Sequence, residues 1–177
     1  RDRHGYPRHL SISGAKGTPD RMIKIAEILS DMISVTSSFQ TMDPVVTKNI
    51  KRQNIDIDEF KKVQNHFNKK GISTYSELIL GLPGETKESH LKGLRELFDY
   101  NSAGISCYNL RMLGGSELDT PENRKTFGIK TKHRLIDGGF GKYSDIYSIE
   151  DEEMALSTNT MEESEILFFR PIHFLTQ

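Results

Sequence analysis

Cysteine is nearly absent from this sequence. Its 177 residues contain one, Cys107, which excludes an intramolecular disulfide and any metal or iron–sulfur site that takes several thiolates from this chain. Six histidines are present, but none of them shows the close spacing typical of metal ligands. The sequence alone therefore predicts no metal site.

Long apolar runs and an excess of one charge are also missing. The most apolar runs, Leu78–Leu82 and Ile166–Phe169, are far shorter than the roughly 20 residues that span a bilayer. Lys and Arg (24) nearly balance Asp and Glu (25), so no general attraction to nucleic acid is encoded. The first residues include neither an initiator Met nor an apolar signal segment. We therefore expect a cytoplasmic location, no membrane span, and a fragment of a longer chain.

The first 113 residues alternate short apolar runs with helix-period segments. This alternation predicts parallel strands crossed by helices, an α/β fold. Each helical segment begins with a capping residue, as at Asp43, Asp56 and Thr86, and Gly71 is expected to end one of them. In the helix after Thr86, leucines and Phe98 are expected to face inward. The expected strands are Leu10–Ser13, Ile33–Gln40, Thr74–Leu82 and Gly104–Leu113.

The alternation of strand and helix patterns stops at residue 116. This divides the chain into a domain of residues 1–115 and an α+β tail of residues 116–177. In the tail we expect a short helix from Thr120, two short strands, and a last helix from Thr160 to about Arg170. The two strands are expected at Lys132–Ile136 and Ile146–Ile149. The acidic run Glu150–Glu153 is typical of a solvated face.

Functional side chains of such folds gather at the carboxyl ends of the parallel strands. Lys16, Gln40 and the turn Gly81–Glu85 all fall there. The glycine-rich turn can let backbone amides approach a ligand or cradle an anion, or it can simply start a helix. Likewise, Lys16 can contact a substrate or only carry charge in solvent.

Three segments together resemble the second half of a radical S-adenosylmethionine enzyme core: Ser38–Gln40, Asn49–Arg52 and Glu77–Thr86. The resemblance implies parallel strands that form part of a (β/α)6 partial TIM-type barrel. It also implies that Gln40 and Glu77 bind the ribose of S-adenosylmethionine, that Arg52 pairs with its carboxylate, and that Ile79 and Gly81 pack on adenine. Glu85 falls one position later than the glutamate of the strict motif, so no role passes to it.

The segments Arg111–Leu118, Phe140–Tyr143 and Glu150–Glu153 are similar to the tail of radical enzymes that carry a cobalamin-binding domain. This similarity implies a 4Fe–4S cluster, S-adenosylmethionine and possibly cobalamin as cofactors. It further implies a small-molecule substrate, with Lys16 and Arg111 on the substrate side, and a reductant protein such as flavodoxin or ferredoxin. Such an enzyme generates a 5′-deoxyadenosyl radical for methylation or rearrangement of an unactivated carbon.

One departure from the family is large, because the Cys-x3-Cys-x2-Cys loop that holds the cluster is missing. The chain is then either the C-terminal part of an enzyme, inactive alone, or a degenerate homologue. Two other functions stay open: a porphyrinogen-oxidase-like or methylthiotransferase-like radical enzyme, and a non-catalytic α/β module that binds a nucleotide or a partner.

Overall fold

A parallel sheet of four strands carries the first half of the chain in the computed structural model, which describes residues 3–13, 19–29, 32–72, 74–100, 102 and 104–176. Its strands run in the order β1-β2-β3-β4, so each unit is added next to the one before it. This confirms the predicted α/β class. The strands are β1 (Leu10–Ser13), β2 (Ile33–Ser38), β3 (Thr74–Leu80) and β4 (Ile105–Asn109).

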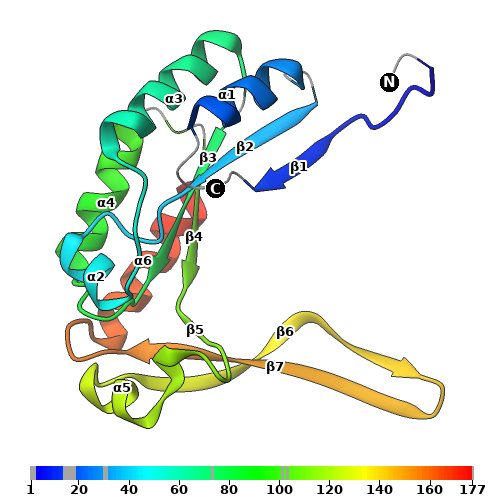
Figure 1. Ribbon diagram of the computed structural model, residues 1–177. Helices are drawn as coiled ribbons and strands as arrows, with labels where there is room; N and C mark the ends of the chain where they lie inside the picture. Colours follow the sequence, from blue (N-terminus) through cyan, green and yellow to red (C-terminus); the bar gives the residue numbers. More distant parts are fainter. Residues whose placement is uncertain are drawn as a thin grey trace.

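Helices connect these strands and cover the outer side of the sheet (Figure 1). The predicted caps are confirmed: the carboxylates of Asp43 and Asp56 accept hydrogen bonds from backbone amides of the first turns, and Thr86 forms a reciprocal capping box with Ser89. Gly71 ends its helix in the left-handed conformation, with φ of 68°. The helices are α1 (Pro19–Ile28), α2 (Pro44–Asn49), α3 (Ile57–Lys70) and α4 (Lys87–Asp99).

The main core lies between β3, α4 and a helix from the other end of the chain, α6 (Glu163–Thr176). Leu78, Leu97 and Phe169 are at most 1% exposed in it. The expectation that Phe98 faces inward is wrong, because its side chain is 53% exposed. The buried face of α4 instead includes His90, on the side where α6 packs.

A second sheet is antiparallel and runs in the order β5-β7-β6. The single strand predicted over Gly104–Leu113 is divided at Leu110, whose amide donates to the Leu80 carbonyl (2.9 Å) while its carbonyl accepts from the Ala155 amide (2.9 Å). Leu110 thus joins the two sheets. The second sheet and its neighbours comprise β5 (Arg111–Met112), the 3-10 helix η1 (Glu117–Asp119), α5 (Pro121–Thr126), β6 (Lys130–Tyr143) and β7 (Ile146–Ser157).

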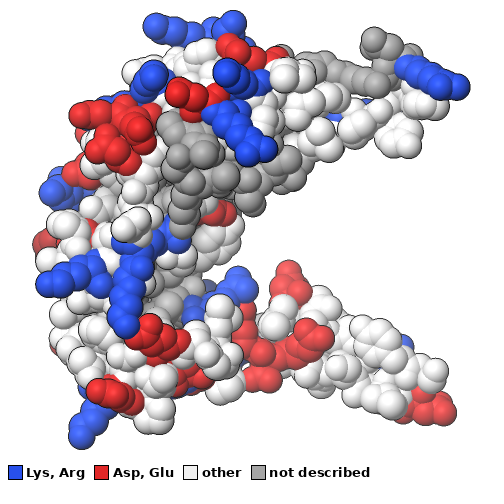
Figure 2. Space-filling view, in the orientation of Figure 1, with Lys and Arg blue, Asp and Glu red and all other residues white. Residues whose placement is uncertain are grey.

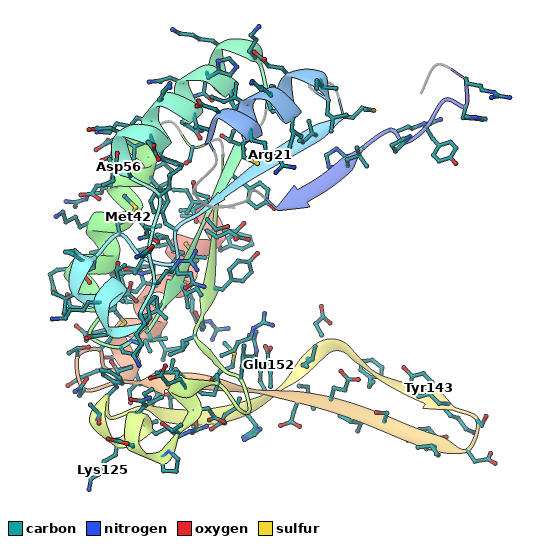
Figure 3. All side chains as sticks on the ribbon, in the orientation of Figure 1. Arg21, Met42, Asp56, Lys125, Tyr143 and Glu152 are labelled. Carbon is teal, nitrogen blue, oxygen red and sulfur yellow. The ribbon has the colours of Figure 1, made fainter. Side chains whose placement is uncertain are left out.

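Strands β6 and β7 are much longer than predicted and project as an arm opposite β1 (Figure 1). The last helix also differs from expectation, since it begins at Glu163 and continues through Pro171 to Thr176. Thr160 does not cap it but donates its hydroxyl to the Glu85 carbonyl (2.7 Å). The outer half of the arm exposes large apolar side chains, among them Tyr143 near its tip (Figure 3).

Two members of the acidic run on β7 do not form a solvated face. Acidic side chains gather at the base of the arm (Figure 2), where Glu152 pairs with Arg111 (3.1 Å) and Arg134, and only 12% of its side chain is exposed. Glu153 pairs with Arg124 at 2.6 Å. Figure 3 places Glu152 where β5 meets this base. The run therefore helps to fix the second sheet in place.

No helix within the described ranges is long and apolar enough to cross a membrane. The domain boundary at residue 115 stays a prediction. Beyond it, α6 shares the main core with the parallel sheet.

Candidate functional site

A cavity of about 850 Å³ opens at the carboxyl ends of the parallel strands, between α2, the end of β4 and the segment around η1 and α5. Its volume lies in the range of small-molecule and cofactor sites. Gln40, Ile79 and Arg111 line it, so the fold brings these three residues to one cavity. Tyr108 and Asn109 of β4 also line it.

Gln40 reaches the cavity because β2 is continued beyond its last residue by one more bond to β3. The Gln40 carbonyl accepts a hydrogen bond from the Ile79 amide at 2.8 Å. Both side chains are partly buried, so the wall of the cavity carries a neutral amide beside an aliphatic surface. Such a pair suits a ligand that has both hydroxyl groups and an apolar ring face.

Ser38, two residues before Gln40, links Arg52 to Glu77. Its carbonyl accepts from Nη2 of Arg52 (3.1 Å), and its hydroxyl donates to the Glu77 carboxylate, its register partner on β3. Partial burial lowers the pKa of Arg52, while the nearby charge of Glu77 acts in the opposite direction. The guanidinium and the carboxylate are thus held in one partly buried chain of contacts.

Arg52 does not line the large cavity. It faces a neighbouring one of about 410 Å³, and Lys48 lines both. The Nε of Arg52 donates to Oδ1 of Asn54 at 3.2 Å. Two of its three nitrogens are therefore engaged, and Nη1 has no hydrogen-bond partner among the described residues.

The glycine-rich turn is held by hydrogen bonds between its own residues. Gly81 has φ of +84°, and its amide donates to Oε2 of Glu85 at 2.7 Å; the Glu85 amide in turn donates to the Leu82 carbonyl (2.9 Å). These two amides are used within the turn, so they do not form an anion cradle. Gly81 is buried and is not among the residues that line the cavity.

Asn49 is a cavity residue that the sequence reasoning did not single out for itself. Its amide nitrogen donates to the Pro83 carbonyl at 3.0 Å, which fastens α2 to the glycine-rich turn. Gly84 makes this approach possible, because a Cβ there would lie 2.5 Å from the Asn49 nitrogen. The signal in the sequence was the second glycine of the turn, whose φ is +85°.

The two substrate-side candidates have different outcomes. Arg111 lines the cavity and is held by Glu152, with about half of its side chain exposed. Lys16 lies outside the described residues. Across the mouth, Lys51 and Glu117 form an exposed ion pair between the end of α2 and η1.

Tyr108 was not singled out from the sequence, because the side chains of β4 had not been assigned to one face of the sheet or the other. Successive side chains of a strand point to opposite sides of the sheet. Tyr108 faces the cavity, and Cys107 beside it packs against the core on the other side. Burial raises the pKa of the Cys107 thiol to about 12.

Two curated proteins are similar in sequence over nearly the whole chain. The cobalamin-dependent radical SAM methyltransferase TokK of Streptomyces tokunonensis is 34% identical over 162 residues, which are 89% of this chain and 24% of that protein. The 2-(S-pantetheinyl)-carbapenam-3-carboxylate methyltransferase of Streptantibioticus cattleyicolor is 31% identical over 97% of this chain and 26% of its own length.

The chain belongs to the radical S-adenosylmethionine superfamily.

The fold agrees with this membership. Coproporphyrinogen III oxidase from Escherichia coli, a radical SAM enzyme, superposes with a TM-score of 0.52 at 21% identity, over 66% of this chain and 29% of that one. No family model matches the sequence. The chain spans about a quarter of the length of the two curated methyltransferases that it matches.

Proposed function

We propose that this chain is the C-terminal part of the barrel, with its tail, of a cobalamin-dependent radical S-adenosylmethionine methyltransferase. The two curated relatives are methyltransferases, and they match this chain almost from end to end. The four parallel strands would then be the later part of a (β/α)6 barrel, and the Cys-x3-Cys-x2-Cys loop would lie in another part of the protein. The observation that carries the proposal is the cavity, with Gln40 and Ile79 on its wall.

The side chains at the cavity suit S-adenosylmethionine. Gln40 would bind the ribose diol from the cavity wall, since a diol donates to neutral and anionic oxygens alike. Glu77 does not line the cavity, and its carboxylate accepts the Ser38 hydroxyl. It would have to turn toward the cavity to accept from the same diol. Ile79 would offer its aliphatic surface to adenine. When bound at a 4Fe–4S cluster, S-adenosylmethionine supplies the 5′-deoxyadenosyl radical, and cobalamin would carry the methyl group.

Arg52 would hold the methionine carboxylate. Its guanidinium is oriented by the Ser38 carbonyl and Asn54, which leaves Nη1 for the ligand. A charge-assisted hydrogen bond contributes about 1.5 to 3 kcal/mol. Because one nitrogen rather than a fork is open, we expect the lower end of that range. This is about a tenfold change in affinity.

The substrate would be a small molecule that enters on the Arg111 side of the cavity. The ion pair with Glu152 fixes the orientation of Arg111 on β5, and the guanidinium would attract a negatively charged group of the substrate. Lys16 stays a candidate for the substrate side on the sequence alone. A reductant protein of the flavodoxin or ferredoxin kind would supply electrons to the cluster in the other part of the enzyme.

Calorimetric titration of S-adenosylmethionine into the intact, cluster-loaded enzyme tests the proposal. We expect Arg52→Ala to weaken binding about tenfold, and Gln40→Ala to weaken it less because its bond is neutral. The matched controls are Arg95→Ala and Gln53→Ala, which remove exposed side chains of the same types. Equal dissociation constants for wild type and both site variants would contradict the assigned roles.

Methyl transfer is the second readout. With S-adenosylmethionine labelled in its methyl group, mass spectrometry should find the label in a small-molecule product that forms only when cobalamin is supplied. Formation of 5′-deoxyadenosine without label transfer would instead favour a radical enzyme of another subclass.

A further inference from the structure

Three side chains with metal-binding atoms meet on the side of the sheet that faces away from the cavity. They are His90 of α4, Cys107 of β4 and His173 of α6, and one ligand atom of each lies within 4.8 Å of the others. The two histidines are 2% and 7% exposed, and Cys107 is partly buried. This cluster is not evident from the sequence, because 83 residues separate the two histidines.

A buried carboxylate orients His90 toward the other two residues. Oε1 of Glu85 lies 2.9 Å from Nδ1 of His90, while Oε2 of the same carboxylate accepts the Gly81 amide. Because an ionised carboxylate only accepts, Nδ1 carries the proton and Nε2 keeps its lone pair. Metal-binding histidines almost always have such a carboxylate or carbonyl partner on the other ring nitrogen.

Nε2 of His90 lies 3.0 Å from Nε2 of His173. Two imidazole nitrogens at about 2.0–2.1 Å from a tetrahedral Zn²⁺ lie about 3.3–3.4 Å from each other, and a thiolate at about 2.3 Å lies about 3.5–3.6 Å from each of them. The histidines are thus already near the required separation. A side-chain movement of the order of 1 Å brings the Cys107 sulfur into place.

Charge at this point is balanced when a divalent cation is bound. Cys107 keeps its proton in the metal-free protein, because burial raises the pKa of its thiol. A metal ion binds the thiolate and releases that proton, and its positive charge then balances the buried sulfur. Two imidazoles and one thiolate form a ligand set that Zn²⁺ prefers over Mg²⁺ or Ca²⁺.

We propose that His90, Cys107 and His173 bind a zinc-type divalent cation, with Glu85 as the partner that positions His90. Three protein ligands leave the fourth tetrahedral position to water. The ion would connect α4, β4 and α6, and so would fix the C-terminal helix to the parallel sheet. This site is separate from the cavity and does not depend on the proposed methyl transfer.

Cobalt is the direct probe, since Co²⁺ takes tetrahedral zinc-type sites and absorbs light. The 177-residue chain, reduced and freed of metal by a chelator, is titrated with Co²⁺ without oxygen. We expect one equivalent to bind with a near-ultraviolet thiolate-to-cobalt band, and Zn²⁺ to remove the band by displacement. Because Cys107 is the one cysteine of the sequence, such a band identifies this residue without any variant.

Variants then separate the ligands from bystanders. His173→Gln and Cys107→Ser should weaken Co²⁺ binding by at least tenfold, and Glu85→Gln should weaken it less while the band remains. His66→Gln is the control, because His66 pairs with Glu27 away from the cluster. Unchanged affinity in both ligand variants would overturn the proposal.

Thermal unfolding of the wild type gives an independent test. Zn²⁺ should raise its Tm above that of the chelated protein, since a ligand that binds only the folded state stabilises it. The competing arrangement is a plain hydrogen bond from His173 to His90. In that case neither a thiolate band nor a Zn²⁺-dependent Tm is found, and the proposal fails.

Discussion

Gly84→Ala tests how the glycine-rich turn is fastened to α2. The substitution adds a Cβ 2.5 Å from the Asn49 side-chain nitrogen, at a residue whose φ is +85°. Gly115→Ala is the matched control, because Gly115 has φ of +83° and a Cβ there meets nothing within 4 Å. The two variants share the backbone strain, and only the first displaces Asn49.

The magnitudes follow from these two contributions. A left-handed residue with a Cβ costs about 1–2 kcal/mol, and the loss of freedom in the unfolded chain returns about 0.4–1 kcal/mol. Both variants carry this difference. Displacement of Asn49 also breaks its bond to the Pro83 carbonyl, which is worth about 0.5–1.5 kcal/mol. Gly84→Ala should therefore be less stable than Gly115→Ala by about that amount.

Urea unfolding of the 177-residue chain measures these free energies, and a double-mutant cycle isolates the Asn49 contribution. In an Asn49→Ala background, the cost of Gly84→Ala should fall to the cost of Gly115→Ala. If Gly84→Ala and Gly115→Ala cost the same in the wild-type background, the turn does not depend on Asn49. A Gly84→Ala penalty that survives removal of Asn49 would refute the steric explanation.

Two further predictions concern packing and pH. Leu97→Ala, at a side chain with no exposed surface, should lower the free energy of unfolding by about 2–5 kcal/mol, whereas Phe98→Ala on the same helix should change it by less than about 1 kcal/mol; similar losses in urea unfolding would show that the face of α4 is misassigned. A hydrogen bond from the Arg124 guanidinium and a weaker contribution from the Thr131 hydroxyl lower the pKa of Glu153 to about 2. The pKa of Glu153 in the folded protein is therefore below the value of about 4.3 in the unfolded chain. The ionised Glu153 side chain stabilises the folded state above about pH 4.3, and this contribution is lost as the pH falls toward 2. Glu153→Gln should flatten the pH dependence of unfolding over this interval, and an unchanged slope would contradict the assignment.

Local signals predicted the parallel half of the fold well. Asp43, Asp56 and Thr86 cap their helices by interactions with residues two or three positions away, so the sequence contains all the information needed. The orientation of α4 could not be obtained in this way. His90 was not counted with the apolar face, because the residues that bury it belong to α6, more than 70 residues later.

The candidate site shows the same division. Gln40 was predicted at the carboxyl edge because it ends a strand pattern, whereas Ile79 was identified through the family resemblance. A hydrogen bond from the Ile79 amide to the Gln40 carbonyl holds the two residues side by side at the cavity. The orientation of Arg52 toward the Ser38 carbonyl depends on the path of the chain between α2 and α3, which has no periodic pattern. The length of the β6–β7 arm was missed for a related reason, since its exposed apolar residues do not alternate as a half-buried strand does.

The contribution of α6 to the main core bears on how the chain folds during synthesis. Phe39 and Leu78 share the main core with Phe169, so a core that begins just after β2 is completed only by residues made about 130 positions later. Contacts of such long sequence separation slow folding. While the ribosome is still producing the arm, the parallel sheet has one face open to solvent, and nascent chains in this state are prone to aggregate. The step that ends this exposure is the docking of α6, so a chaperone that binds nascent chains would have most to protect just before residue 169 leaves the exit tunnel.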